Sequence, residues 1–375
     1  MAIATTFSVF IAILLSFANG ANDVSRGIST LIGSGVDHRR ALLWGSLWTG
    51  VGAVLSFFFA TAMLETFTSG WIASEIRIDA MFGVAVGLGA SVWVLLASRV
   101  GLPVSTTHSI SGAIIGVGWF AFGAGNIQWM QLLNKIGLPL LFSPFIALAL
   151  TFLLYRPLYF LLRPERQVAL CIGITQPVAQ HLAVPKNVLQ AAGLQVSEVS
   201  ASNQMEVCVY RPTFLRINCD RIHWLSSALI SAARALNDMP KIAAIAAFAY
   251  LTVRDQMNWW LIGLLLAVSM TVGSYVGGRR VSEVMGNDVT NLKRECDGPI
   301  ANLITGILVT VAAKMGLPVS TTHVSSGAIA AVGLRRGAKA VDWVTLRNFI
   351  MAWIATLPIT GVLAVVVYVL LGYIF

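Results

Sequence analysis

Two short runs of hydroxyl side chains are the first residues in this sequence whose chemistry stands out. The segment Pro-Val-Ser-Thr-Thr-His occurs twice, and its hydroxyl residues are Ser105, Thr106, Thr107, Ser320, Thr321 and Thr322. Each run follows a Gly-Leu stop and precedes small residues, which is typical of a helix that begins at the serine. A helix N-terminus within a membrane presents free backbone N–H groups and a positive dipole end, which suit an anion. We therefore predict that the six hydroxyls bind a tetrahedral oxyanion, the alternative being ordinary helix caps.

Two Asn-Asp pairs, Asn22-Asp23 and Asn237-Asp238, supply the second element of chemistry. A carboxylate inside an apolar span is costly unless it is paired, so it indicates a functional site by default. Carboxylate and amide oxygens form the shell that a hard cation prefers. Both pairs are therefore predicted to couple a cation, with Asp23 and Asp238 acting either as Na⁺ ligands or as proton carriers.

Basic side chains and imidazoles accompany both motifs. Arg26 and Lys241 lie three residues after the two aspartates, on the same helical face. They are predicted either to neutralise the carboxylates in structural ion pairs or to bind the anion directly. His108 and His323 end the two hydroxyl runs and fit a phosphate donor or proton carrier. The alternative for each histidine is an imidazole that hydrogen-bonds a backbone carbonyl within the protein.

The paired motifs belong to one internal repeat. Residues 101–118 and 316–333 are identical at 14 of 18 positions, at an offset of 215 residues, and the same offset aligns the two Asn-Asp pairs. Extended along the chain, the offset predicts a first transmembrane repeat over 1–160, a linker or insert over 161–215, and a second repeat over 216–375. The insert is more polar than either repeat and contains two short β-like runs.

The composition indicates a protein that resides in a membrane. The chain of 375 residues is 57% hydrophobic and only 11% charged, whereas soluble domains carry about 25% charged residues. Several runs reach the length of about 20 apolar residues with which a helix spans a bilayer. The net charge of +9 is distributed over loops between these runs, so we interpret it as a determinant of topology rather than a nucleic-acid site.

Charge placement predicts that the two repeats have opposite orientations. At least five apolar spans are expected in the first repeat, and an odd number inverts the second copy. Because Lys and Arg stay on the cytoplasmic side, the basic loop 37–40 and its non-basic counterpart indicate opposite faces, as do the uncharged loop 121–128 and its counterpart with Arg335 and Arg336. We predict a multi-pass protein of the plasma membrane, with both termini outside and the insert in the cytoplasm; Lys314 is the one misfit.

Polar residues within apolar spans predict broken or re-entrant helices. Residues 1–33 are long for one span and contain an Asn-Asp pair, and Pro240 interrupts the second copy just after Asp238. Residues 80–122 leave room for extra turns. Inverted repeats with paired broken helices are typical of secondary transporters, whose substrate binds near the midplane where the copies meet. The predicted fold class is an all-α polytopic membrane protein with two inverted-topology repeats.

The cysteines match no disulfide framework or paired zinc motif. Cys208 and Cys219 with His181 and His223 form a possible metal set, but ordinary reduced cysteines are the favoured interpretation.

With these motifs in hand, the chain resembles the inorganic phosphate transporter (PiT) family. The resemblance rests on Gly-Ala-Asn-Asp at 20–23, Leu-Asn-Asp at 236–238, and the two Pro-Val-Ser-Thr-Thr-His runs, and it covers both repeats but not the insert. It implies ion-coupled phosphate uptake, with Na⁺ in some members and H⁺ in others, and suggests a homodimer. Family members commonly have small residues after the Asn-Asp pair, whereas Arg26 and Lys241 stand there in this chain, which favours H⁺.

The predicted function is therefore a secondary symporter of inorganic phosphate coupled to H⁺ or Na⁺. No cofactor is expected other than Na⁺ as a coupling ion. The alternatives are a permease for sulfate or another oxyanion, an anion channel, and a membrane-embedded enzyme with a Ser/Thr-His pair. An enzyme is disfavoured, because such a nucleophile needs a third, orienting group and no known hydrolase motif is present.

Overall fold

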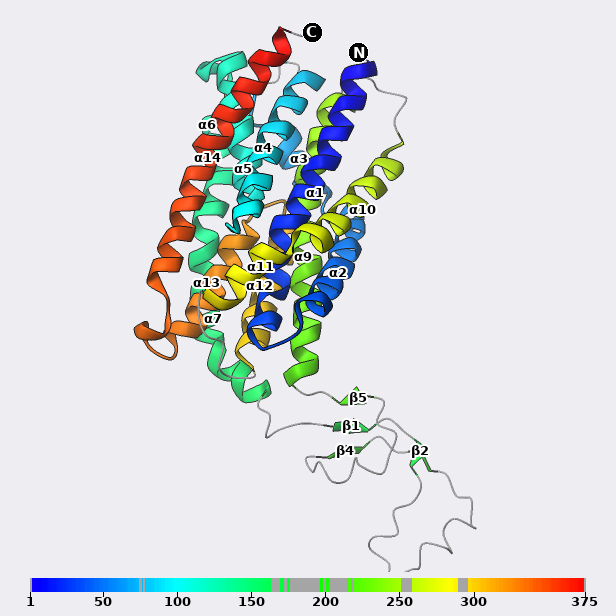
Figure 1. Ribbon diagram of the computed structural model, residues 1–375, viewed down its shortest axis with the longest axis vertical. Helices are drawn as coiled ribbons and strands as arrows, with labels where there is room; N and C mark the ends of the chain where they lie inside the picture. The colour runs from blue at the N-terminus through cyan, green and yellow to red at the C-terminus, as the bar shows by residue number, and fades with distance from the viewer. Residues whose placement is uncertain are drawn as a thin grey trace, which may run out of the picture.

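The computed structural model describes residues 2–73, 76, 78–162, 219–250, 258–288 and 296–373, together with five short strands between 169 and 216. It is an elongated bundle of helices (Figure 1). The main helices are α1 Ala2–Gly33, α2 His38–Phe59, α3 Thr61–Thr68, α4 Ala80–Val100, α5 Thr106–Phe122, α6 Trp129–Leu132, α7 Leu138–Leu162, α9 Cys219–Tyr250, α10 Trp259–Gly277, α11 Arg279–Asp288, α12 Asp297–Lys314, α13 Thr321–Leu334 and α14 Trp343–Gly372. The strands are β1 Ala169–Cys171, β2 Ile174–Thr175, β3 Val196–Ser197, β4 Ser200–Ser202 and β5 Leu215–Arg216.

The strands lie beyond the end of the bundle where α7 ends and α9 begins (Figure 1). β1 pairs with β4 and with β5, and β2 pairs with β3, all antiparallel. They fall within or at the edge of the predicted insert. The first β-like run, residues 171–180, contains β2, whereas the second, residues 203–212, lies outside the described residues. The predicted repeat boundaries at 160/161 and 215/216 remain predictions.

The protein is a multi-pass membrane protein. Among the described residues, six helical stretches are long and apolar enough to cross a membrane: α1, α2, α4, the stretch Trp129–Leu162, α10 and α14. Large apolar side chains such as Phe58, Leu153 and Val362 are exposed on the outside of the bundle. In a water-soluble protein such a surface would be a liability, but it is the surface that a lipid bilayer covers.

The two repeats run through the bundle in opposite directions (Figure 1). α1 begins at the end of the molecule where α14 finishes, whereas α9 begins at the opposite end. The pair α4–α5 lies toward the first end and the pair α12–α13 toward the other. This arrangement agrees with the inverted topology that the charged loops predicted.

Each repeat contains a helical hairpin that enters the bundle and returns to the same side. The turn at the tip of α4–α5 has Gly101 with φ 81°, and the tip of α12–α13 has Gly316 with φ 70°; glycine adopts this left-handed conformation without steric cost. Gly101 packs against Arg280 and Val284 of α11. Correspondingly, the hydroxyl of Thr66 on α3 donates to the carbonyl of Gly316 at 2.9 Å. The hairpin tip of each repeat therefore contacts a helix of the other repeat.

These hairpins correct the predicted number of crossings. Residues 80–98 and 104–122 were each expected to cross the membrane, but they form the two arms of one re-entrant hairpin. A hairpin removes two crossings, so the number per repeat stays odd and the inversion argument survives. Arg99 and Lys314 both lie near the hairpin tips, so Lys314 is no longer a misfit.

The helices that carry the Asn-Asp pairs are unbroken, which corrects a second expectation. α1 runs for 32 residues through Asn22-Asp23, and α9 runs for 32 residues through Asn237-Asp238 and Pro240. A proline is tolerated inside a membrane helix because neighbouring elements satisfy the backbone group that it frees. Here the polar residues signal buried partners on other helices rather than a break.

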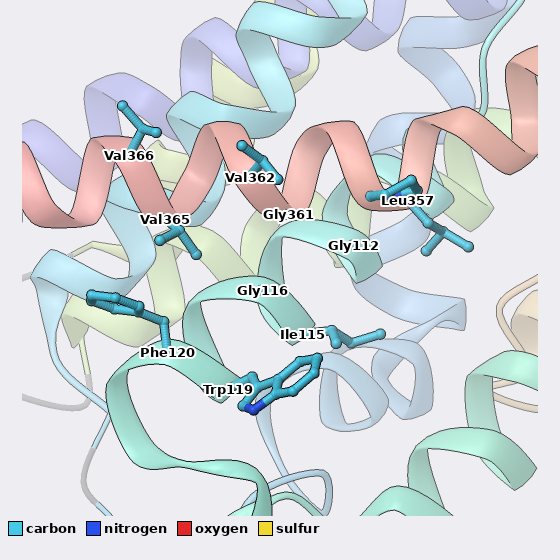
Figure 2. A pocket seen from close by; sticks show the side chains of 11 residues that line it. Gly112, Ile115, Gly116, Trp119, Phe120, Leu357, Gly361, Val362, Val365 and Val366 are labelled. Carbon is cyan, nitrogen blue, oxygen red and sulfur yellow. The ribbon is translucent and has the colours of Figure 1, made fainter.

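Small residues let α5 and α14 approach closely near the first hairpin. Gly112 and Gly116 of α5 face Gly361 of α14 (Figure 2), and a Cβ added at Gly116 would lie 2.6 Å from the Cα of Gly361. Glycines at such a contact permit backbone packing between membrane helices. Trp119 and Phe120 line an apolar groove of about 650 Å³ beside this contact.

Cys219, at the start of α9, and Cys296, just before α12, are joined in a disulfide. The expectation of reduced cysteines is therefore wrong for this pair. The proposed metal set is also unsupported where it can be checked: His223 contacts the hydroxyl of Thr30 at 3.0 Å, and the part of the chain that the structure describes holds no cluster of three metal-ligating residues. His181 and Cys208 lie outside the described residues.

Candidate functional site: a buried ion cluster between the hairpin tips

The N-termini of α5 and α13 are capped by the first hydroxyl of each run. The Ser105 hydroxyl accepts a hydrogen bond from the backbone N–H of His108 at 3.2 Å, and Ser320 accepts from that of His323 at 3.4 Å. The cap that was weighed as an alternative thus applies to the two serines. The threonines that follow have different partners.

Arg26 connects its own repeat to the hairpin of the other. Its Nη1 lies 3.1 Å from the Asp23 carboxylate, while its Nη2 donates to the Thr322 hydroxyl at 2.6 Å. Nη2 also donates to the carbonyl of Val104 at 2.8 Å, and Nη1 donates to the side chain of Asn22 at 3.0 Å. The side chain is fully buried, so this guanidinium holds a fixed position between α1 and the two hairpin turns.

Lys241 makes the equivalent connection in the reverse direction. Its Nζ lies 3.1 Å from the Asp238 carboxylate and donates to the Thr107 hydroxyl at 2.6 Å. A third contact is with the carbonyl of Val319 at 3.3 Å, the residue at the repeat offset from Val104. Each aspartate–cation pair therefore reaches a threonine of the opposite repeat, and the two connections cross at the centre of the bundle.

The two carboxylates also meet each other through Asn19. Its amide nitrogen donates to Asp23 at 3.0 Å and to Asp238 at 3.1 Å, and lies 3.1 Å from the Thr106 hydroxyl. Thr106 itself donates to Asp23 at 3.3 Å. Two like charges this close repel each other unless cations and hydrogen-bond donors compensate them, and here both kinds of partner are present.

Arg234 adds a third buried cation that the sequence reasoning missed. Its Nη1 donates to the side chain of Asn19 at 3.2 Å, and its Nη2 donates to Thr49 at 2.7 Å and to Ser274 at 3.1 Å. Its Nε–H is buried and has no hydrogen-bond partner among the described residues. A signal was present: Asn19 and Arg234 are related by the repeat offset, each one turn before its aspartate, and a basic residue inside an apolar span indicates function.

The asparagines of the Asn-Asp pairs hold the hairpin turns in place. Asn22 donates to the hydroxyl of Ser98 and to the carbonyl of Leu102, both at 3.0 Å. Asn237 donates to the carbonyl of Val319 at 3.0 Å. These contacts position the turn on which each hydroxyl run begins, and the cation coupling predicted for the two asparagines stays a prediction.

The two histidines come together behind the hydroxyl runs. The rings of His108 and His323 have centroids 4.6 Å apart. His108 Nδ1 lies 2.8 Å from the Ser105 hydroxyl, a contact within the first helical turn, and His323 Nδ1 lies 3.4 Å from the carbonyl of Leu140. The ring of His323 also packs on Trp353. The contacts of His323 match the alternative of an imidazole bonded to a backbone carbonyl.

The cluster as a whole carries an excess of positive charge. Arg26, Arg234 and Lys241 contribute three positive charges, and Asp23 and Asp238 contribute two negative ones, all fully or almost fully buried. The fourteen residues singled out from the sequence are likewise all buried. Because an uncompensated charge is costly at this depth, the site is suited to an anion, which helix N-termini and guanidinium groups attract.

A bundle of inverted repeats with a buried ion cluster where two re-entrant hairpins meet is an arrangement typical of membrane transporters. Residues 4–364 match the model of the phosphate transporter family, so the chain belongs to that family. The chain is 28% identical to "Putative phosphate permease" of Pyrococcus horikoshii, with 94% of each protein covered. It is 26% identical to "Probable low-affinity inorganic phosphate transporter" of Bacillus subtilis, with 100% of this chain and 98% of the relative covered.

Two further matches concern parts of the sequence and the fold. A segment covering 31% of this chain is 43% identical to "Sodium-dependent phosphate transporter 1-B" of Danio rerio, of which it covers 17%. The solved structure "The sodium-dependent phosphate transporter" superposes with a TM-score of 0.80 at 23% identity, covering 100% of both chains. This structural match establishes the shared fold.

Proposed function

We propose that the protein is a secondary active symporter of inorganic phosphate, coupled to H⁺ in preference to Na⁺. The observation that carries this proposal is the crossed arrangement of Arg26 with Thr322 and Lys241 with Thr107. An anion between the hairpin tips would contact groups from both repeats at once. Relative movement of the repeats would then expose it to one side or the other, which is how inverted-repeat transporters achieve alternating access.

Phosphate suits the basic groups that gather here. Arg26 and Lys241 each reach a hairpin tip, where they donate to the Thr322 and Thr107 hydroxyls, and the buried Nε–H of Arg234 is a further donor without a partner among the described residues. Guanidinium groups match the spacing of phosphate oxygens and bind them with strong, charge-assisted hydrogen bonds. The names of the relatives, which refer to phosphate permeases and transporters, support the same substrate.

The coupling ion follows from the charge of the cluster. Asp23 and Asp238 each have a basic nitrogen 3.1 Å from a carboxylate oxygen. A bound Na⁺ would need the same oxygens as ligands. With one excess positive charge in the cluster, phosphate monoanion is neutralised without another metal ion, and the dianion needs one proton. Na⁺ is the second candidate, because the zebrafish relative is named as sodium-dependent.

We propose further that this transporter resides in the plasma membrane, with its termini outside and residues 161–215 in the cytoplasm. Arg39, Arg335 and Arg336 support this orientation, because they lie in loops or helix ends on the side where α7 ends, and basic residues mark the cytoplasmic face. The homodimer suggested by the family resemblance stays a prediction.

The proposal is tested by uptake of radiolabelled phosphate into proteoliposomes with the membrane potential clamped. An inward proton gradient in sodium-free buffer should drive accumulation above the external concentration, and protein-free liposomes serve as the control. Accumulation only with an inward Na⁺ gradient would overturn the choice of H⁺. No accumulation under either gradient would overturn symport, and stronger inhibition by sulfate than by unlabelled phosphate would assign the site to sulfate.

A further inference from the structure

A basic cavity lies at the open end of the α12–α13 hairpin, the end opposite to the tip that carries Thr322. It has a volume of about 580 Å³. It is lined by the last turns of α7 and by the C-terminal end of α13, and its polar lining includes Tyr155, Arg156, Tyr159, Arg335 and Arg336. Three guanidinium groups therefore face one cavity at the edge of the bundle, away from the central ion cluster.

The charges around this cavity are only partly balanced. Arg336 forms an ion pair with the buried carboxylate of Asp297, which also accepts a hydrogen bond from the Tyr155 hydroxyl at 2.6 Å. Within the described parts of the chain, no carboxylate forms an ion pair with Arg156 or Arg335. Two positive charges are left over, and they stand on two different helices.

The guanidinium of Arg335 is also held in a defined orientation. Its Cζ lies 4.8 Å from the centroid of the Phe152 ring and 5.9 Å from that of Tyr155. A guanidinium stacked on an aromatic face keeps its N–H groups directed outward from its edge. In this orientation two N–H groups of the arginine can donate to two oxygens of one phosphate.

The first repeat shows that the hairpin does not need these charges to fold. The repeat offset places Phe82 opposite Asp297, Phe120 opposite Arg335, and Leu371 opposite Arg156. At that end the hairpin is closed by apolar packing, in which the ring of Phe82 stacks on that of Phe122 with centroids 5.8 Å apart. The basic residues are thus specific to one end of one hairpin. Basic residues also mark this face of the membrane, but here three of them line a single cavity, which suits an anionic ligand.

We propose that this cavity binds a phosphate-bearing anion, either free inorganic phosphate or the headgroup of an anionic phospholipid. Arg156 of α7 and Arg335 of α13 would share its oxygens, so the bound group would tie the second hairpin to α7. Tyr159 and Phe160 line the same cavity, and aromatic side chains with arginine at a membrane edge suit a lipid headgroup. The site is separate from the central cluster and does not depend on the transported substrate.

The test is protection of individual arginines from phenylglyoxal, read by mass spectrometry of the purified full-length protein. Arg39, exposed in the first turn of α2, is the internal reference for reagent activity. One arm compares phosphate with an equal ionic strength of chloride in neutral detergent, and the other compares nanodiscs of phosphatidylcholine with nanodiscs containing phosphatidylglycerol. In one of the two arms, Arg156 and Arg335 should react about fivefold or more slowly relative to Arg39.

The arm in which protection appears identifies the source of the anion. Protection by phosphate alone assigns a free-phosphate site, and protection by phosphatidylglycerol alone assigns a lipid headgroup. The variant Arg335→Gln should then remove the protection of Arg156, because both side chains bind the same group. Reaction rates of Arg156 and Arg335 that follow Arg39 in both arms would overturn the proposal, as would unchanged protection of Arg156 in the variant.

Discussion

The two re-entrant hairpins are nearly alike at their tips and unlike at their open ends. At the tips, a basic side chain of the opposite repeat donates to Thr107 in one copy and to Thr322 in the other, at 2.6 Å in both cases. At the open ends, Phe82 packs among aromatic rings in the first copy, whereas Asp297 pairs with Arg336 in the second. The two tips contribute to one shared site, which restricts the residues that can occupy them. Each open end faces its own side of the membrane, so the residues there can differ between the copies.

A second difference lies within the shared site itself. Asn19 and Arg234 occupy equivalent positions in α1 and α9, and they hydrogen-bond each other at 3.2 Å. If both were asparagine, the cluster would have equal numbers of positive and negative charges. The single arginine therefore gives an otherwise symmetric cluster its excess positive charge, and we infer that it sets the affinity for the anion.

The largest effect is expected from Asp23→Asn and Asp238→Asn, which remove one carboxylate from each half of the cluster. Each change leaves Arg26 or Lys241 buried without its counter-ion, a loss that typically costs about 3–5 kcal/mol. Coupled phosphate uptake should be abolished in both variants while the protein still inserts in the membrane. Uptake per reconstituted protein is the measurement, and Asp220→Asn, at an exposed position of α9, is the matched control. Normal transport in either variant would remove that aspartate from the mechanism.

Arg234→Asn tests the asymmetry by making the two repeats alike at this position. Loss of one buried cation lowers attraction for the anion, and a charged hydrogen bond contributes about 1.5–3 kcal/mol. The apparent Kd for phosphate, measured by isothermal titration calorimetry, should rise at least about tenfold. An unchanged Kd would show that Arg234 serves only to hold Asn19, Thr49 and Ser274.

Arg26→Lys and Lys241→Arg ask whether the two crossed connections are equivalent. The guanidinium of Arg26 reaches Thr322, Val104 and Asn22 at once, and a lysine cannot reproduce that fork. We expect Arg26→Lys to lower kcat/KM for uptake about tenfold. The reverse change, Lys241→Arg, retains the charge and adds donors, so its loss should be smaller. Equal losses in the two variants would contradict this difference.

Thr107→Val and Thr322→Val should have the smallest effects, and similar ones, because the two hydroxyls occupy equivalent positions. Each change replaces a hydroxyl by a methyl group of similar size. It leaves Lys241 or Arg26 with one hydrogen-bond partner fewer, at a cost of about 1–2 kcal/mol. We expect KM for phosphate to rise about fivefold to tenfold in each single variant. If KM stays the same in both, the two hydroxyls serve only to hold Lys241 and Arg26 in place.

Much of this site was predictable from the sequence because its residues occur twice. The duplicated hydroxyl runs and Asn-Asp pairs predicted that these residues would meet where the two copies meet, and the charged loops predicted the inversion. Arg234 was missed because its counterpart is Asn19, so a search for matching residues passes over it. Its position within an apolar span was nevertheless a sufficient signal.

The hairpins were harder to predict for a physical reason. Helix α4 has 21 residues, long enough to cross a membrane, so length cannot distinguish a crossing from one arm of a re-entrant hairpin. The Asn-Asp pairs led to the opposite error, because they predicted breaks in two helices that are continuous. Polar residues in a membrane span indicate either a helix break or buried partners on other helices. Only the packing of α1 against α9 and the hairpin tips shows that buried partners are the reason here.

The most direct test of the shared site is a crystal structure with arsenate, a tetrahedral analogue of phosphate whose arsenic atom has an anomalous signal. The central claim predicts an arsenic peak between the N-termini of α5 and α13, within hydrogen-bonding distance of Thr107, Thr322 or the Nε–H of Arg234. Soaking with excess phosphate should displace it. The claim would be contradicted if arsenate bound only elsewhere, or if saturating arsenate gave no peak between the two hairpin tips.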